Sequence, residues 1–169
     1  MFKKVAIATP AAILALTSSM AFAEGEARHS INLVAKVPTS VFHVQPVDPD
    51  VITKDQVLHY DPIGDQLSSL RAQFDTKNSN GSIAAMLENE AYLSNGVVAD
   101  KIPLVVKFNG VTLTNTAPVE VVNEAESTPG KRVYLDIVPT KPATGGYKAG
   151  DYTGVVAMRF DAVLPPPPR

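Results

Sequence analysis

The clearest fold signal is the stretch IPLVVKFNGVTLT, which occupies residues 102–114. Residues 102–108 and residues 111–114 are both rich in β-branched and large apolar side chains. Between them stands Asn109-Gly110, a pair that accepts the left-handed backbone of a two-residue turn. The stretch therefore predicts an antiparallel β-hairpin.

Short extended runs recur on both sides of this hairpin. They comprise residues 41–44, 57–60, 70–75, 119–122 and 133–138. Prolines and glycine-containing turns separate the runs, and helices do not alternate with them along the chain. This arrangement is typical of an antiparallel β-sandwich, so the expected fold class is all-β.

A second hairpin is predicted in the middle of the chain. Residues 70–75 alternate between apolar and polar side chains, and a turn, Asn78-Ser79-Asn80-Gly81, follows. The return strand is expected over residues 83–87. Residues 84–91 also contain good helix formers, so the pattern alone leaves a helix open there.

A long final strand is predicted over residues 151–164. Four prolines, residues 165–168, end it because proline has no N–H to donate to a sheet. One predicted face carries Tyr152, Gly154, Val156, Met158, Phe160, Ala162 and Leu164, and the other carries Thr153, Ala157, Arg159 and Asp161.

Composition excludes several functions. The 169 residues include 15 Lys and Arg against 17 Asp and Glu, with no basic cluster that could neutralise phosphates, so nucleic acid is not an expected partner. The chain has no Cys, which excludes disulfides, thiolate nucleophiles and Cys-ligated zinc. With 45% hydrophobic residues it can still build a core.

The beginning of the chain has the order of a secretory signal peptide. Lys3 and Lys4 precede an apolar run over residues 5–16, and the small residues Ala21 and Ala23 follow. The run is short for a membrane span. We expect cleavage before Glu24 and export of the remaining chain.

No catalytic or metal-binding motif stands out. The three histidines, His29, His43 and His59, are too widely spaced to act together from one element. No Gly-x-Ser-x-Gly turn presents a nucleophile, and Glu124 and Glu126 lie in a polar loop. The sequence therefore predicts no enzyme activity, no metal and no cofactor.

Residues 30–37 alternate between two faces and follow a polar leader, with Ser30, Asn32, Val34 and Lys36 on the outer face. Ile31, Leu33, Ala35 and Val37 share one face of the predicted strand. The pattern alone fits two roles equally well. The strand is either the first strand of its own sandwich or one that completes the sandwich of another copy by β-strand addition.

Three motifs resemble those of the major subunits of colonization-factor-antigen type fimbriae, the alternate or alpha class of chaperone–usher pilins, which includes cable pilins. Residues 30–38 are similar to the family's alternating opening, and residues 102–113 to its proline-led strand and Gly turn. Residues 149–156, Ala-Gly-Asp-Tyr-Thr-Gly-Val-Val, are very like the family's Ala-Gly-x-Tyr-x-Gly-Val-Val. The segment 165–169 extends past the family's usual end.

The resemblance implies an incomplete immunoglobulin-like β-sandwich completed by donor-strand exchange. It implies Ile31, Leu33, Ala35 and Val37 as donor-strand residues, and Val156, Met158 and Phe160 as residues of the acceptor groove. The implied partners are identical or related pilin subunits in a head-to-tail fibre, a periplasmic chaperone, an outer-membrane usher and a tip adhesin.

The expected organisation is a signal peptide (1–23), an extension with the donor strand (24–38), a pilin domain (39–164) and a proline-rich tail (165–169). The expected function is that of a structural subunit of a surface fimbria that serves cell adhesion, exported through the periplasm. The alternative is a self-contained secreted β-sandwich that binds a carbohydrate or a protein.

Overall fold

The computed structural model describes residues 42–142 and 146–165. All of them belong to one compact unit of the chain, residues 37–169. The predicted signal peptide, the candidate donor strand with Ile31, Leu33, Ala35 and Val37, and His29 lie outside the described residues.

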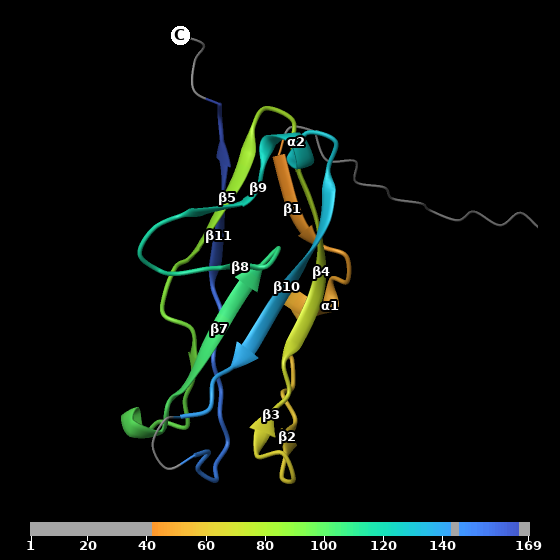
Figure 1. Ribbon diagram of the computed structural model, residues 1–169. Helices are drawn as coiled ribbons and strands as arrows, with labels where there is room; N and C mark the ends of the chain where they lie inside the picture. The colour runs from red at the N-terminus through yellow and green to blue at the C-terminus, as the bar shows by residue number, and fades with distance from the viewer. Residues whose placement is uncertain (1–41, 143–145, 166–169) are drawn as a thin grey trace, which may run out of the picture. The chain divides into compact units, whose positions relative to one another are not determined.

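The larger sheet is antiparallel throughout (Figure 1). Its order is β1-β4-β10-β7-β6, and a short strand, β8, pairs with β7 at its side. The bounds are β1 Phe42–Pro46, β4 Leu70–Asn78, β6 Tyr92–Leu93, β7 Ile102–Phe108, β8 Val111–Thr112 and β10 Lys131–Pro139.

A second sheet has the order β11-β5-β9, and β2 and β3 form a small separate hairpin. The strand bounds are β2 Tyr60–Asp61, β3 Gln66–Leu67, β5 Ser82–Leu87, β9 Val119–Val122 and β11 Met158–Val163. The helical turns are α1 Asp50–Thr53, η1 Val98–Asp100 and α2 Glu124–Ser127.

The core lies between the two main sheets. Every second residue of β4 and β10 is buried, as expected for strands with one inward face. The Phe108 ring is fully buried, and its centroid lies 5.5 Å from that of Phe74 and 4.8 Å from that of Phe160. Because Phe160 belongs to β11, this aromatic group joins the two sheets. The predicted all-β sandwich is confirmed.

The predicted hairpin over residues 102–114 is confirmed. Asn109 and Gly110 have φ values of 51° and 80°, which are the positive angles that a tight turn of this kind requires. The Asn109 side chain donates a hydrogen bond of 2.6 Å to the carbonyl of Val121 in β9. The turn therefore also ties the larger sheet to the smaller one.

The second predicted hairpin is wrong in its pairing. β4 and β5 lie in different sheets, so the turn between them is an arch across the core. Asn78 is buried in this arch, donates to the carbonyl of Ser82 (2.7 Å) and accepts from the Asn80 N–H (3.2 Å). A Cβ at Gly81 would overlap the carbonyl oxygen of Val163 in β11. The helix left open for residues 84–91 does not form.

The predicted final strand is only half right. β11 begins at Met158, whereas Thr153 forms an isolated bridge with Ser94 next to β6. Val156, Met158 and Phe160 of the predicted face are half-buried, but Gly154, Ala162 and Leu164 of the same face are exposed. The segment therefore changes neighbours along its length, which a single alternating strand does not do.

The domain has two distinct ends. The arch pole holds the turn over residues 78–82, with α2 against it. Ser127 of α2 is fully buried and donates a hydrogen bond to the carbonyl of Gly81. The hairpin pole, at the bottom of Figure 1, holds β2 and β3. β10 starts near the arch pole, with Lys131 opposite Thr76, and ends at Pro139 near the hairpin pole.

Candidate functional site

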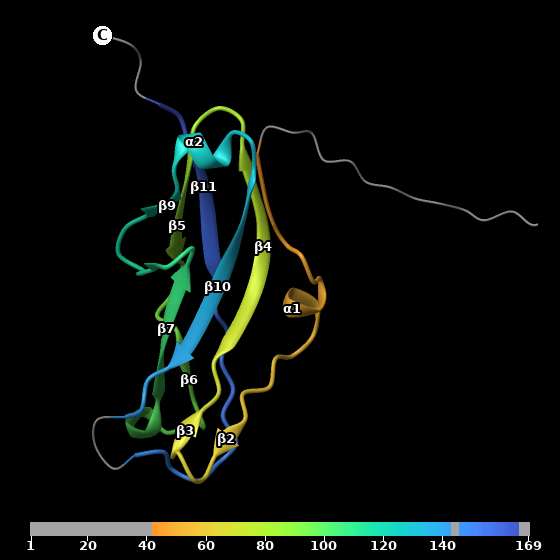
Figure 2. The same ribbon diagram turned by 45° about the vertical axis from the view of Figure 1, so that its right-hand side comes forward.

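The strands β1 and β11 lie at the same lateral side of the sandwich. Figure 2 shows β9, β5 and β11 following one another from left to right, and β7, β10 and β4 in the same direction. The Asn109 hydrogen bond to β9 links the sheets at one side. Among the described strands, β11 pairs only with β5, and β1 pairs only with β4. The opposite side therefore holds two strands that each have one unpaired edge within the described part of the chain.

Half-buried apolar side chains gather on these two strands and on the segment just before β11. The predicted groove residues Val156, Met158 and Phe160 all pack against the core and retain partial exposure. Phe42 and Val44 of β1 do the same. Sequence reasoning did not assign these last two residues to the site, although their period of two in the run over residues 41–44 was a usable signal.

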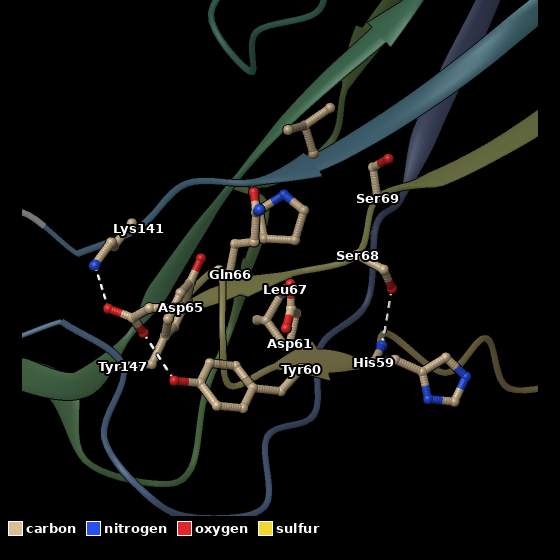
Figure 3. A pocket seen from close by; sticks show the side chains of 13 residues that line it. His59, Tyr60, Asp61, Asp65, Gln66, Leu67, Ser68, Ser69, Lys141 and Tyr147 are labelled. Carbon is tan, nitrogen blue, oxygen red and sulfur yellow. Dashed lines mark hydrogen bonds and ion pairs between the residues drawn. The ribbon is translucent and has the colours of Figure 1, made fainter.

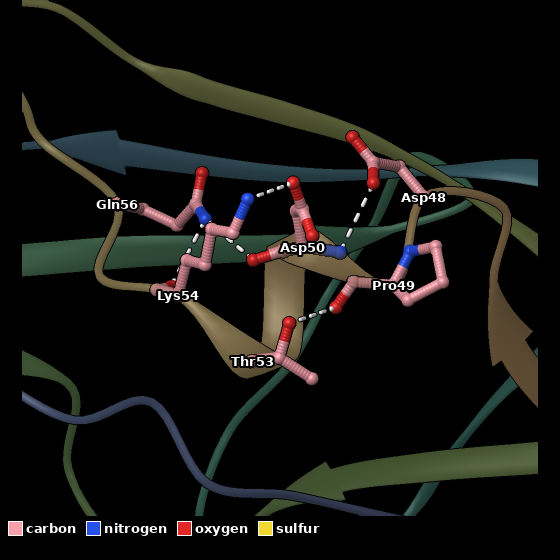
Figure 4. Close-up of polar contacts among 6 residues, drawn as sticks. All are labelled: Asp48, Pro49, Asp50, Thr53, Lys54 and Gln56. Carbon is pink, nitrogen blue, oxygen red and sulfur yellow. Dashed lines mark hydrogen bonds and ion pairs between the residues drawn. The ribbon is translucent and has the colours of Figure 1, made fainter.

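A short helix, α1, follows β1 and contributes Val51 to the same core surface. Local polar contacts hold the turn, as Figure 4 shows. The Asp50 N–H donates to Asp48 Oδ1 (3.0 Å), Thr53 Oγ1 donates to the carbonyl of Pro49 (3.0 Å), and Lys54 Nζ lies 2.6 Å from Asp50 Oδ2. These contacts are exposed and fix the position of the chain after β1.

Residues 149–156 hold the segment that precedes β11 against β6 and the residues that follow β6. Ser94 and Thr153 exchange backbone hydrogen bonds of 2.8 and 3.0 Å. The Tyr152 hydroxyl donates to the carbonyl of Lys148 (3.1 Å) and accepts from Asn95 Nδ2 (3.4 Å). A Cβ at Gly154 would overlap the carbonyl oxygen of Tyr92 in β6. Glycine is therefore required at position 154 by close backbone approach.

An open pocket of about 810 Å³ lies at the hairpin pole, and we call it the hairpin pocket (Figure 3). The Tyr60 hydroxyl donates a 2.8 Å hydrogen bond to Asp65 Oδ1, and Lys141 Nζ pairs with Asp65 Oδ2. The Lys141 ammonium, followed by the Tyr60 hydroxyl, lowers the pKa of Asp65. The hydrogen bond to Asp65 raises the pKa of Lys141 and of Tyr60.

A smaller pocket of about 340 Å³ shares Tyr60, Leu67 and Tyr147 with the hairpin pocket. Tyr152, the buried Ile102 and Ala149 add further apolar lining, with Lys148 and Gly150 beside them, and we call it the tyrosine pocket. The rings of Tyr60 and Tyr147 meet edge to face, with centroids 5.9 Å apart and planes at 74°. The motif over residues 149–156 supplies Ala149, Gly150 and Tyr152 to the tyrosine pocket, but the sequence predicted neither pocket because their other residues come from separate segments.

The histidines and glutamates that the sequence analysis considered as catalytic or metal-binding residues lie in separate parts of the described structure. His43 lies in β1 and His59 in the hairpin pocket. Glu124 opens α2, and Glu126 pairs with Lys131 at 2.7 Å. Within residues 42–142 and 146–165, no three His, Asp or Glu side chains lie close enough to hold a metal ion. In the same residues, no helix combines the length and apolar character needed to cross a membrane.

The comparison with family models decides the identity. The model of the CS1 type fimbrial major subunit matches residues 27–161, well over half of the chain. This chain belongs to that family. The pilin is thus a structural subunit of a pilus at the cell surface, and its family and fold are those of a structural fimbrial subunit.

The solved structures support the same fold. The pilin matches the structure of the CooA pilin subunit from enterotoxigenic Escherichia coli, with a TM-score of 0.56 and 21% identity. The match covers 70% of this chain and 86% of that one. Comparison with curated protein sequences gives no significant match.

Proposed function

We propose that the pilin polymerises by donor-strand exchange, with residues 30–37 of one subunit adding to the β11 edge of the next. The observation that carries this proposal is the pair of strands β1 and β11, whose half-buried apolar residues occupy one lateral side of the sandwich. A sheet edge offers a row of backbone N–H and C=O groups, and an added strand satisfies them.

The candidate donor strand matches this surface chemically. Ile31, Leu33, Ala35 and Val37 share one face, and the other face carries Asn32 and Lys36 beside Val34, so the first face is the one that can be inserted. We assign Val156, Met158 and Phe160 to the acceptor groove, together with Phe42 and Val44. Burying the three larger donor side chains is worth roughly 1.5–3 kcal/mol each before ordering costs.

The direction of insertion follows from the sheets. Every pairing among the described strands is antiparallel. A donor strand that runs antiparallel to β11 keeps this pattern. It gives a head-to-tail contact, and repeated contacts of this kind produce an open fibre.

The route to the surface completes the proposal. Residues 1–23 direct export, and cleavage before Glu24 frees the extension. A periplasmic chaperone covers the apolar side until an outer-membrane usher exchanges it for the donor strand of the next subunit. The finished fibre serves cell adhesion, with a tip adhesin as a further partner.

A matched pair of substitutions tests the exchange. Leu33→Asp places a charge in an apolar groove and should abolish fibres in electron micrographs, while the monomer stays folded. Asn32→Asp, on the outer face of the same strand, should leave fibres in place. If Leu33→Asp unfolds the monomer, or if both variants behave alike, residues 30–37 are an ordinary internal strand.

A further inference from the structure

The tyrosine pocket has the surface chemistry of a proline-binding site. Tyr60 comes from β2, whereas Tyr147 and Tyr152 come from the segment that precedes β11, and the three rings line the pocket together with Leu67 and Ile102. Grooves lined by aromatic side chains bind proline-rich segments, because the flat pyrrolidine rings pack on the aromatic faces. Proline-rich segments also lose little conformational entropy on binding, since they are already extended.

The chain itself contains such a segment. Residues 165–168 are four consecutive prolines, and Arg169 follows them. We call residues 165–169 the proline tail. Proline has no N–H to donate to a sheet, and the proposed donor-strand exchange does not use these residues.

The tail and the pocket belong to opposite poles of one domain. β11 pairs Val163 with Ser82, so the chain reaches the tail at the arch pole. β1 pairs Phe42 with Asn78, so the chain also enters the domain at the arch pole. Tyr60 of β2 and Leu67 of β3 line the tyrosine pocket, so the pocket lies at the hairpin pole, where Figure 1 shows these two strands. The tail therefore starts far from the pocket of its own subunit.

The proposed fibre brings these two poles together in neighbouring subunits. β11 runs from the hairpin pole to the arch pole, so an antiparallel donor strand runs the other way. Its last residue, Val37, then lies at the hairpin pole of the accepting subunit. Because Phe42 of the donating subunit follows soon after, the arch pole of one subunit faces the hairpin pole of the next.

The distances are compatible with contact. The five Cα steps from Val37 to Phe42 span at most about 18 Å, which limits the separation of the two poles. The four steps from Pro165 to Arg169 extend about 12 Å in a polyproline conformation. The neighbouring hairpin pocket also presents Asp61, a carboxylate with no ion pair among the described residues, to the Arg169 guanidinium.

We propose that the proline tail of one subunit docks in the tyrosine pocket of the next subunit. This inference rests on the proposed donor-strand exchange and adds a second contact between the same two subunits. The two contacts act on one interface, so each raises the effective concentration of the other.

Engineered cysteines test the contact, because the chain has no Cys of its own. The full-length chain with Arg169→Cys and Ala149→Cys carries one thiol on the tail and one at the exposed lining of the tyrosine pocket. The matched control combines Arg169→Cys with Ala125→Cys, an equally small and exposed change in α2 at the arch pole. Oxidised, sheared fibres are heated in detergent without reductant and separated by size.

The pocket pair should give a ladder of disulfide-linked multimers that collapses to monomer with reductant, and the control pair should give no ladder. Adding Tyr147→Ala to the pocket pair should remove most of the ladder. Fibres of the pocket pair that assemble but give no ladder would overturn the tail contact and leave donor-strand exchange standing. A disulfide between Cys at positions 169 and 125 within one chain of the control would do the same, because it would place the tail on its own subunit. Absence of fibres from the unsubstituted chain would instead refute the proposed function.

A second measurement covers variants that fail to assemble. Deleting residues 165–169 and substituting Tyr147→Ala should each speed the release of monomer from fibres in denaturant. If tail and pocket touch, the double variant should release monomer no faster than the single ones. Additive effects of the two changes would contradict the contact.

Discussion

Phe160→Ala should lower both the stability of the folded subunit and the stability of the fibre, and the two losses can be measured separately. The Phe160 ring centroid lies 4.8 Å from that of the fully buried Phe108, but Phe160 itself is only half-buried in the subunit. Truncating a fully buried Phe costs about 3–5 kcal/mol, so the half-buried ring should contribute about 2 kcal/mol within the subunit. In the proposed fibre, the donor strand covers the rest of the ring.

The subunit part can be measured in the monomeric Leu33→Asp background by circular dichroism. A loss of about 2 kcal/mol should lower the melting temperature of a domain of this size by roughly 6–12 °C. The fibre part appears as a further drop in the temperature at which sheared fibres release monomer. Asp161→Ala, which removes only an exposed contact to Arg159, is the matched control and should change both by little. The reasoning fails if Phe160→Ala lowers neither temperature.

Two further predictions concern the hairpin pole and its neighbourhood. Gly154→Ala would force a Cβ onto the carbonyl of Tyr92, so it should destabilise the subunit by about 1–3 kcal/mol in thermal melts, whereas Val155→Ala, at a residue that is 83% exposed, should be nearly neutral. Equal effects of the two changes would contradict the overlap. The pKa of Asp65 is lowered, so its bond to Lys141 stabilises the folded chain above the unfolded carboxyl pKa and is lost as pH falls through the folded value. The pKa of Lys141 is raised, so its contribution is present below the unfolded lysine pKa and disappears as pH rises through the folded value. NMR titration should show the pKa of Asp65 rising in Lys141→Met, and an unchanged pKa would exclude the pairing.

The contrast between two turns shows how far the sequence predicts this fold. Asn109-Gly110 and Asn80-Gly81 look alike, yet the first closes a hairpin and the second crosses between sheets. Turn chemistry fixes the local backbone and does not say which sheet the next strand joins. β5 gave little pattern to read, because nearly all of its residues are buried and no alternation marks a solvent-facing side.

The candidate site was predictable to a similar degree. The period-two pattern placed Val156, Met158 and Phe160 on one face, and all three pack against the core, while their role in the groove stays a prediction. It could not show that Tyr152 and Thr153 turn away to contact residues near β6, because that depends on backbone approach at Gly154. The hairpin pocket and the tyrosine pocket could not be predicted from the sequence, since their tyrosines come together only in the folded chain.

Completing the sandwich within one chain tests the central claim most directly. The engineered chain lacks residues 30–37 at their original place and carries them after Leu164, behind a short Gly/Ser linker that replaces residues 165–169. β11 ends at the arch pole, so the relocated strand can fold back antiparallel along it. A second chain lacks residues 30–37 altogether and serves as the reference.

Donor-strand exchange predicts that the engineered chain is a monomer and melts well above the reference. Burial of Ile31, Leu33 and Val37 is worth roughly 1.5–3 kcal/mol each, and every net kcal/mol should raise the midpoint by roughly 3–6 °C. Analytical ultracentrifugation gives the state of assembly, and calorimetry gives the two melting temperatures. Equal melting temperatures for the two chains would mean that the β11 edge accepts no donor strand.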